Sequence, residues 1–424
     1  MNEPTIFERR RRVLGASPLF YEQPLHFVRG EGVHLYAADG RRYLDCYNNI
    51  PVVGHCNPHV VAAMANQART LNVHSRYVSD VVVSYAERLL GTFKTGLDQM
   101  IFTCTGSEAN DQALRIARAL GAGRGIICSN YTYHGNTAAV DEVSPLFHPN
   151  ANDFPEVRTI PFPQMYRPLV KGSEEEIADA YLAKVDEAIE SFERSGVGLA
   201  GIILCSIFAN EGLPNVPHGF LAKACARVRS AGGVVIADEV QSGFGRTGVM
   251  WGHELMGFEP DLVTMGKPMG NGYPVAAVVG RTAMLDAFRS KVFYFNTFAG
   301  APVAAATANA VLDVIEDEQL MHNARIVGDR IRDGFRRMAD ACSLIGDIRG
   351  MGLWIGVELV RDRQTLEPAT EEAGRLVNLM KEAGALVSRI GPFDNVLKIR
   401  PPLIFNEENA DELLAITESC LRQL

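Results

Sequence analysis

A lysine at the end of an apolar segment is the first residue of this sequence that could do chemistry. Lys267 follows residues 262–265 in the stretch LVTMGKPMGNGYP, among glycines and prolines. Burial among apolar groups would lower the pKa of this lysine, because burial disfavours the charged form, and the neutral amine is a nucleophile. The glycines allow close backbone approach and positive φ. We therefore expect a nucleophilic lysine; a solvated lysine after a strand is the alternative.

A carboxylate ends another apolar segment. Asp238 follows the run VVIA in GGVVIADEVQSGFGRTG, 29 residues before Lys267. That spacing suits adjacent strands joined by one crossover. An ionised carboxylate at the mouth of a buried strand needs a cationic or hydrogen-bonding partner, since its pKa otherwise rises. A protonated heteroaromatic nitrogen would be such a partner. An aspartate that caps a helix is the alternative.

Two further stretches carry weaker signals. In FTCTGSEAND, Thr105 and Glu108 form a capping-box pattern, and Gly106 and Ser107 expose backbone N–H groups at a helix start. Such a start binds anions because unpaired donors and the helix dipole point at the same place. In SNYTYHGNT, Tyr133 could stack on a planar ligand. An ordinary helix cap and a core tyrosine are the alternatives.

The elements that must position these residues follow a strand–helix alternation. Near-continuous runs of valine, isoleucine and alanine predict strands covered on both faces. A helix is predicted over residues 173–194, with a capping box of Ser173 and Glu176. The pattern predicts an α/β fold with a doubly wound, mostly parallel sheet, whose ligands bind beyond the carboxyl ends of the strands. The predicted strands are 100–103, 125–128, 201–205, 233–237, 262–265 and 275–279.

The two ends of the chain have a different pattern. VHLYAADGRRYLDC predicts a hairpin turned at Asp39-Gly40. Residues 303–340 predict two helices, and LIGDIRGMGLWIGVELV predicts strand, turn and strand. A helix over 370–384 and a last strand and helix within 397–423 complete an α+β unit. We expect a large domain of residues 61–309, and a smaller domain formed by residues 1–60 and 310–424.

The composition argues against several classes of protein. The 424 residues are 47% hydrophobic and 21% charged, with a formal net charge of −9, as in soluble globular proteins. Nucleic acid is not an expected partner, because the arginines at 9–12 form only one short basic cluster, predicted to be a solvated helix face. No apolar stretch reaches the roughly eighteen residues of a membrane span. Eight scattered cysteines and a polar N-terminus favour free thiols and a cytoplasmic protein.

Other catalytic motifs fail on inspection. Pro268 follows Gly266-Lys267, where a phosphate-binding P-loop needs serine or threonine. Gly257 stands where a metalloprotease helix that begins at His253-Glu254 needs its second histidine. We expect no metal.

An anion-binding helix start, a stacking aromatic, a carboxylate and a nucleophilic lysine together suggest pyridoxal 5′-phosphate. From YLDCYNN to RPPLIF, the chain resembles the class III (ω-) aminotransferases, pyridoxal-phosphate enzymes of fold type I, most specifically in ADEVQSGFGRTG and MGKPMGNG. The resemblance implies that Lys267 forms a Schiff base with the cofactor and that Asp238 pairs with its pyridinium nitrogen. It places Val240 and Tyr133 on the two ring faces and Gln241 near the phenolic oxygen.

The same resemblance implies how the cofactor phosphate is bound. Gly106 and Ser107 would hold it, and a threonine of the neighbouring subunit would complete the phosphate site. The stretch FNTFAG places that threonine at Thr297. A homodimer with active sites at the subunit interface is the expected minimum assembly.

The chain departs from the family pattern at the substrate site. An arginine usually lies three residues before the paired prolines, where it binds the substrate carboxylate; here that position is Lys398, and Arg400 directly precedes Pro401. Lysine lacks the bidentate fork of arginine. Cys205 occupies the position of the glutamate that gates that arginine. These changes put the usual reaction with 2-oxoglutarate in doubt.

Within the class, the chain is most similar to ethanolamine-phosphate and phosphohydroxylysine phospho-lyases, through LDCYNNIPVVGHCNPHV, LNVHSRYVSD, VTMGKPMGNGYPVA and LKIRPPL. Arg76 is then a candidate ligand of a substrate phosphate, with a structural arginine as the alternative. Tyr21 and Asn49 are further substrate candidates. We expect transfer of the amino group of a primary amine or amino acid to a keto acid. Elimination of phosphate from phosphoethanolamine or a similar amine is the alternative, and racemisation or a non-catalytic binding role is less favoured.

Overall fold

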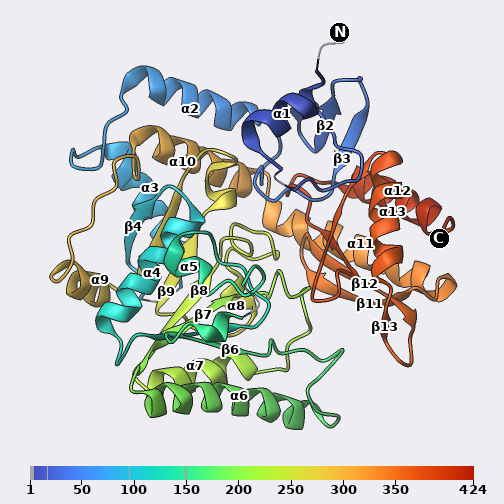
Figure 1. Cartoon of the computed structure of the whole chain (residues 1–424). Helices are drawn as coiled ribbons and strands as arrows, with labels where there is room; N and C mark the ends of the chain where they lie inside the picture. The colour runs from blue at the N-terminus through green and yellow to red at the C-terminus, as the bar shows by residue number, and fades with distance from the viewer. Residues whose placement is uncertain (1–3, 17, 95, 149) are drawn as a thin grey trace.

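A seven-stranded sheet forms the centre of the protein (Figure 1). The computed structural model describes residues 4–16, 18–94, 96–148 and 150–424. In spatial order the strands are β4 (Gln99–Thr103), β10 (Ala276–Gly280), β9 (Leu262–Met265), β8 (Val234–Asp238), β7 (Leu199–Cys205), β5 (Gly125–Ser129) and β6 (Val157–Ile160). β10 runs antiparallel to both of its neighbours, and the other pairs are parallel. The expected mostly parallel sheet is confirmed.

Alternating side chains of the strands pack against helices on both faces of the sheet. On β7, Ile202 and Leu204 contribute to one apolar cluster, and Ile203 contributes to another. The first cluster includes residues of α6 (Glu174–Ser195), α7 (Phe220–Ser230) and α10 (Pro302–Asp317); the second includes residues of α4 (Gly106–Leu120), α5 (Ala138–Asp141) and α9 (Thr282–Arg289). Burial on both faces explains the near-continuous apolar strands. All six predicted strands are present; β6 was missed because Arg158 and Thr159 interrupt its short apolar pattern.

Both predicted capping boxes form. Ser173 Oγ accepts from the backbone N–H of Glu176 at 3.3 Å, so α6 begins and runs as predicted. Thr105 Oγ1 accepts from Glu108 N at 3.1 Å, and the Glu108 carboxylate accepts from Cys104 N and Thr105 N. These bonds satisfy backbone donors at the helix starts.

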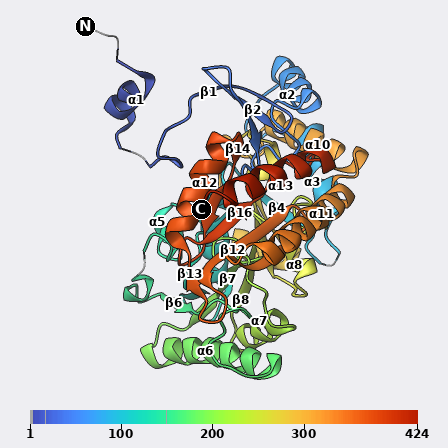
Figure 2. The ribbon, with the colours of Figure 1, turned by 90° about the vertical axis from the view of Figure 1, so that its right-hand side faces the viewer.

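Both ends of the chain share one small sheet. Its order is β1 (Phe27–Glu31), β2 (His34–Ala37), β3 (Arg42–Asp45) and β14 (Ala385–Leu386). β2 and β3 form the predicted hairpin, with Gly40 at a φ of +87°. β3 pairs in parallel with β14, so the N-terminal strands lie beside the C-terminal helices (Figures 1 and 2). The domain boundaries at residues 60/61 and 309/310 stay a prediction.

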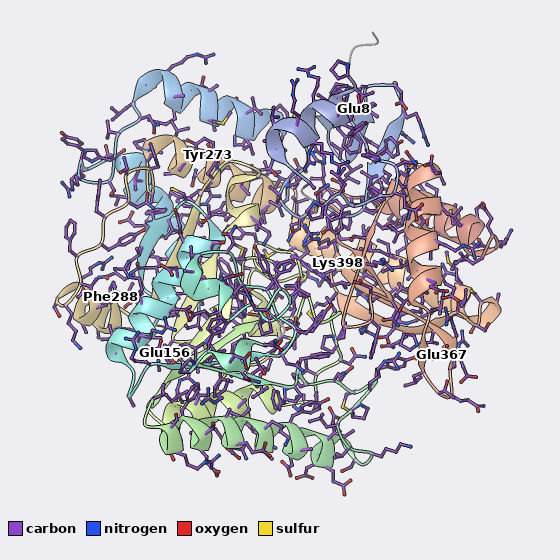
Figure 3. All side chains as sticks on the ribbon, in the orientation of Figure 1. Glu8, Glu156, Tyr273, Phe288, Glu367 and Lys398 are labelled. Atoms are coloured by element: carbon purple, nitrogen blue, oxygen red, sulfur yellow. The ribbon has the colours of Figure 1, made fainter. Side chains whose placement is uncertain are left out.

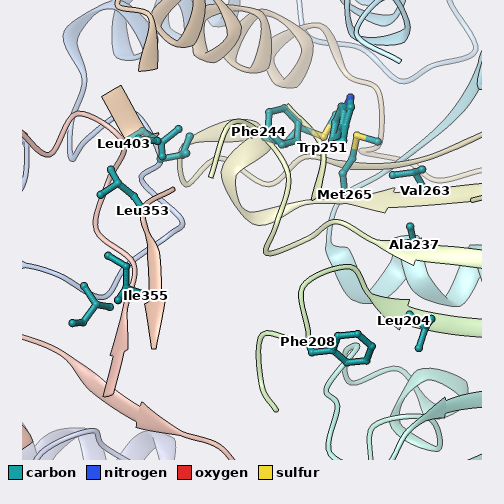
Figure 4. Packing of buried hydrophobic residues seen from close by; sticks show 14 of the residues in the cluster. Leu204, Phe208, Ala237, Phe244, Trp251, Val263, Met265, Leu353, Ile355 and Leu403 are labelled. Atoms are coloured by element: carbon teal, nitrogen blue, oxygen red, sulfur yellow. The ribbon is translucent and has the colours of Figure 1, made fainter. Parts of the chain in front are cut away.

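A third sheet carries the C-terminal residues of interest. Its order is β11 (Ile345–Met351), β12 (Trp354–Asp362), β16 (Val396–Ile399) and β15 (Ser388–Ile390), with β13 (Glu367–Pro368) paired to β12. The C-terminal helices are α11 (Leu320–Ala341), α12 (Thr370–Glu382) and α13 (Glu407–Leu421), as the sequence predicted within a few residues. Apolar side chains of this part and of the central sheet form one continuous cluster (Figure 4).

Three helices of the N-terminal segment complete the fold. α2 (Pro58–Thr70) and α3 (Asp80–Leu90) pack on α10, whereas α1 (Ile6–Leu14) stands off the body of the protein (Figure 2). The arginines of α1 are largely exposed, in agreement with the predicted solvated face. Among the described residues, no helix is long and apolar enough to cross a membrane.

Candidate cofactor and substrate site

One cavity at the carboxyl ends of the strands brings together most of the predicted cofactor residues. β8 and β9 end side by side in the sheet, and β4 leads directly into α4. The cavity is lined by Gly106, Ser107, Tyr133, His134, Gly135, Asp238, Val240, Gln241 and Lys267. Every predicted cofactor residue except Thr297 therefore lies on its wall.

Lys267 begins a short 3₁₀ helix, η2 (Lys267–Gly270), immediately after β9. Its side chain lines the cavity, so the solvated-lysine alternative is wrong. Burial lowers the pKa of Lys267, and Arg400 lowers it further, against the opposing effect of Asp238. The φ of Lys267 is +22°, an unusual conformation for a residue with a side chain. A buried amine with a lowered pKa is suited to nucleophilic attack and proton transfer.

Asp238 is buried, with 4% of its surface exposed, and its carboxylate is held by three donors. Oδ2 accepts from Asn110 Nδ2 at 2.9 Å and lies 2.6 Å from His134 Nδ1; Oδ1 accepts from Val240 N at 3.0 Å. The helix-cap alternative is wrong, since the next helix, α8 (Gly252–Leu255), begins well beyond it. This arrangement fixes a carboxylate where it can face a cationic ring nitrogen.

The start of α4 forms part of the cavity wall. The first N–H groups of a helix have no intrahelical acceptor, so those of Gly106 and Ser107 suit an anion. Gly135 has a φ of +147°, and a Cβ there would lie 2.5 Å from Ser107 Oγ. A Cβ on Gly106 would lie 2.9 Å from a methyl group of Val240. A side chain at either position would collide with these atoms, so glycine is what allows the close packing of this wall.

Lys398 lies on β16, toward the middle of the molecule (Figure 3), and Arg400 directly follows this strand. Arg400 donates to Gln241 Oε1 at 2.7 Å and to the backbone oxygen of Tyr47 at 2.7 Å. Lys398 is 3% exposed, and its Nζ lies 5.3 Å from the centre of the Trp354 ring. Burial lowers the pKa of Lys398 strongly, and Arg400 and Lys267 lower it further.

Sequence reasoning missed several residues of the site. His134 and Asn110 position Asp238, and Thr264 in turn donates to Asn110 Oδ1 at 2.5 Å. Asn210 contacts Lys398 and Gln241 from the loop after β7. His134 stands in the stretch SNYTYHGNT, and Asn110 is a polar residue on the buried face of a predicted helix. The rule that ligands bind beyond the carboxyl ends of strands points to the loop of Asn210.

The other predicted residues lie apart from the cavity walls. Thr297 is exposed, and Arg76 lies over the ring of Phe295 at 4.3 Å. Tyr21 is half-buried and donates to the backbone oxygen of Val387 at 2.9 Å. Asn49 is buried, and its Nδ2 has no hydrogen-bond partner among the described residues. Their roles stay predictions.

Cys205 and Glu211 flank the loop that follows β7. Cys205 is buried and lies opposite Asp238 in the pairing of β7 with β8. Burial raises the pKa of the Cys205 thiol, which keeps it neutral. Glu211, six residues further on, is also buried; burial raises the pKa of its carboxyl group, which accepts from Ser129 Oγ. No group of three or more metal-ligating side chains occurs among the residues that the structure describes.

The residues of the cavity fit pyridoxal phosphate. The α4 start and Ser107 supply donors for a phosphate, and Asp238 supplies a carboxylate for a pyridinium nitrogen. Val240 and Tyr133 supply apolar and aromatic surface for a planar ring, and Lys267 supplies an amine for an aldehyde. Glycine at positions 106 and 135 allows the close packing of the backbone around the α4 start.

Comparisons with known proteins agree with this geometry. The profile of the family described as aminotransferase class-III matches residues 20–421. The chain is 41% identical to an alanine–glyoxylate aminotransferase 2-like protein of Drosophila melanogaster, over 98% of this chain and 86% of the relative. It is 36% identical to ethanolamine-phosphate phospho-lyase homolog 1 of Caenorhabditis elegans, over 98% of this chain and 93% of the relative.

Among solved structures, a phospholyase from Arthrobacter in complex with phosphoethanolamine superposes with a TM-score of 0.95. Its sequence is 43% identical, and the match covers 99% of this chain and 100% of that one. The relatives thus include proteins named for transamination and proteins named for phosphate elimination. This chain belongs to the class III aminotransferase family and is a pyridoxal-phosphate enzyme of fold type I.

Proposed function

We propose that this enzyme eliminates phosphate from a small O-phosphorylated primary amine such as phosphoethanolamine. One observation carries the proposal. Lys398 and Arg400 are buried next to residues of the cavity wall and its adjoining loop, and neither forms an ion pair with a carboxylate among the described residues. Buried cations without acidic partners are costly, and an anionic substrate would neutralise them.

The type of cation suits phosphate. Lysine binds phosphate as a point charge, and it lacks the planar fork with which the family's usual arginine holds a substrate carboxylate. Arg400 donates from one nitrogen to Gln241 and from another to the Tyr47 backbone, whereas Lys398 donates to the neutral amide of Asn210. The likeness to the Arthrobacter phospholyase, with phosphoethanolamine bound to that protein, supports the same substrate class.

The neutral Cys205 supports a reaction with one substrate. A transaminase must accept a second substrate, a keto acid, in the same pocket. The family arrangement for that task pairs an arginine with a movable glutamate, and here Lys398 and Cys205 stand at the two positions. An elimination needs no amino acceptor and hence no such exchange.

Amino transfer from a primary amine or amino acid to a keto acid is the second candidate. The 41% identity to a relative named as an aminotransferase favours it. Both reactions begin with removal of a proton from the carbon that bears the nitrogen. Lys267 and Asp238 would act alike in both, so these two residues do not distinguish them.

The residues of this chain have separate roles in the proposed reaction. Pyridoxal phosphate, when bound, supplies an aldehyde that condenses with amines and a ring that accepts electrons. The α4 start holds the phosphate of the cofactor, and Asp238 favours the protonated form of its ring nitrogen. Lys267, with its lowered pKa, takes the proton from the substrate carbon. The electrons of the broken C–H bond form a C=C bond as the C–O bond breaks, and Lys398 neutralises the phosphate that departs with the electrons of the C–O bond. Water then hydrolyses the released enamine to acetaldehyde and ammonia.

We also propose a cytoplasmic homodimer. Phe293 and Phe298 are 79% and 75% exposed in the same loop as Thr297, and such exposed aromatic side chains are typical of subunit interfaces. A second copy would then supply Thr297 to the phosphate site. All eight cysteines are free thiols, which suits a reducing compartment.

A single assay distinguishes the two reactions. Purified enzyme receives either phosphoethanolamine alone or an ω-amine together with pyruvate. Release of inorganic phosphate and acetaldehyde without a keto acid supports the proposal. Formation of alanine in the second mixture, with no phosphate released in the first, would establish the transaminase instead. The variant Lys267→Ala is the blank for both mixtures.

A further inference from the structure

Asn210 joins the two halves of the site through one side chain. It lies in the loop after β7 and is 5% exposed. Its Oδ1 lies 3.4 Å from Lys398 Nζ and 3.4 Å from Gln241 Nε2. Its Nδ2 donates to the backbone oxygen of Tyr133 at 3.4 Å. Asn210 thus contacts the cation assigned to the substrate and two residues assigned to the cofactor.

The loop of Asn210 is fixed by groups from distant parts of the chain. The backbone N–H of Asn210 donates to Glu211 Oε2 at 3.1 Å, and Ser129 on β5 binds the other oxygen of that carboxylate. On the far side, Arg349 Nε on β11 donates to the backbone oxygen of Gly212 at 2.7 Å. Arg349 is itself paired with Glu358 at 2.7 Å. The position of Asn210 is therefore set by the packing of the central sheet against the C-terminal sheet.

A neutral amide side chain suits position 210, between Lys398 and Gln241. Its oxygen accepts hydrogen bonds from Lys398 and Gln241 without neutralising the lysine. A carboxylate at the same place would pair with Lys398 and compete with an anionic ligand. We propose that Asn210 is a positioning residue that holds Lys398 and Gln241 together and leaves the charge of Lys398 free for the anionic group of the substrate. The inference rests on the proposed anionic substrate, but it can be tested without turnover.

The charges around Lys398 define a test by pH. Arg400, on the same strand end, and Lys267, on η2, lower the pKa of Lys398 in addition to burial; Cys205, on β7, and Glu211, in the loop, oppose them. Lys398 therefore loses its proton at a lower pH than an ordinary lysine. Anion binding should weaken as the pH rises through that lowered pKa. A carboxylate in place of the Asn210 amide would raise the pKa and move this loss to higher pH.

The experiment measures binding of inorganic phosphate to the holoenzyme by calorimetry, over the pH range in which the enzyme stays folded. In Asn210→Ala we expect phosphate affinity to fall about tenfold, the worth of a hydrogen bond to a charged group. The cofactor absorbance should keep its wavelength. In Asn210→Asp, which has the same shape, phosphate affinity should fall at least as much, and its decline should move to higher pH. Asn215→Asp makes the same change at an exposed position five residues along and should alter neither property.

Two results would overturn the inference. One is phosphate affinity within about twofold of the parent in both Asn210 variants, since a positioning role requires a measurable loss. The other is an Asn210→Asp variant whose pH dependence does not move. Failure of the proposed reaction is a separate result: the parent would release no phosphate from phosphoethanolamine, while its phosphate affinity still depended on Asn210.

Discussion

The cofactor side of the site, around Asp238, and the proposed substrate side, around Lys398, differ in whether their buried charges have partners. On the cofactor side, Asp238 is buried but satisfied by Asn110, His134 and the Val240 backbone. On the substrate side, Lys398 is equally buried, and Asn210 is its hydrogen-bond acceptor among the described residues. A buried carboxylate with its hydrogen bonds formed is held rigidly. A buried ammonium group without an acidic partner raises the free energy of the folded protein, and an anionic ligand lowers that free energy. From this difference we infer that the Asp238 side suits a permanently bound group and that the Lys398 side suits an anion that binds and leaves.

Removal of the Lys267 side chain should have the largest effect on the activity of the enzyme. We expect Lys267→Ala to lose the visible absorbance of the Schiff base and at least about a thousandfold in rate, because the same amine holds the cofactor and moves a proton. Absorbance spectra and product assays measure the two effects. Lys223→Ala, at an exposed position on α7, serves as the control. Turnover at the parent rate without the absorbance would show that the chemistry does not depend on this lysine.

Loss of charge on the cofactor side should have the next largest effect. Asp238→Asn keeps the shape of the side chain but removes the negative charge that favours a protonated ring nitrogen. We expect a fall in rate of about a hundred- to a thousandfold, the range seen when a preorganised electrostatic contact is removed. Steady-state rates with saturating cofactor measure it. A rate near that of the parent would mean that His134 or another group can replace the carboxylate.

On the substrate side, Lys398→Met should impair binding while sparing the fold. We expect kcat/KM for phosphoethanolamine to fall about ten- to a hundredfold, mainly through KM, since a hydrogen bond to a charged group is lost. The free energy of unfolding should not fall, because methionine relieves an unpaired buried charge. Lys398→Arg should recover part of the affinity. A large loss of stability in Lys398→Met would contradict the comparison.

The pH dependence of KM in the parent enzyme is a second test of the role of Lys398. Because burial, Arg400 and Lys267 lower the pKa of Lys398, the binding of an anionic substrate should weaken as the pH rises through that lowered value. KM values measured from acidic to alkaline pH should show this rise in the parent, and the rise should be absent in Lys398→Met. A KM that rises equally in both would assign the titration to another group.

The smallest effect is expected behind Asp238, at Glu239. Burial alone would raise the pKa of this carboxyl group, but hydrogen bonds from His253, Ser242 and Ser206 hold the pKa below its ordinary value. A folded-state pKa that is lowered stabilises the fold above the unfolded-state pKa, and this stability is lost as the pH falls through the folded value. Glu239→Gln should therefore lower the free energy of unfolding by about 1–3 kcal/mol at neutral pH.

Denaturant unfolding at neutral and acidic pH tests the role of Glu239. The difference between Glu239→Gln and the parent should shrink as the medium becomes acidic, since the parent loses its advantage when Glu239 is protonated. A difference that stays constant with pH would assign the loss to packing instead of charge.

The two sides also differ in how far the sequence predicted them. Gly106, Ser107, Asp238 and Lys267 each stand at or just after the end of an apolar run, and one rule about strand ends placed them all. Cys205 obeys the same rule. Asn210 was missed because it lies five residues beyond the end of β7. Phe208 and Leu213 of the same loop have positive φ, a backbone conformation that local sequence patterns do not reveal.

The sequence by itself determined the sheet, its helices and the cofactor chemistry, because apolar periodicity and strand-end polar residues are local signals. Tertiary structure decided what surrounds Lys398. Its neighbours Asn210 and Lys267 follow strands of the central sheet, and Trp354 lies on the adjacent strand β12, so these groups meet Lys398 only when the C-terminal sheet forms and packs on the central one. The pKa and the free charge of a lysine depend on which groups face it, and the facing groups here are set by contacts across nearly two hundred residues of chain.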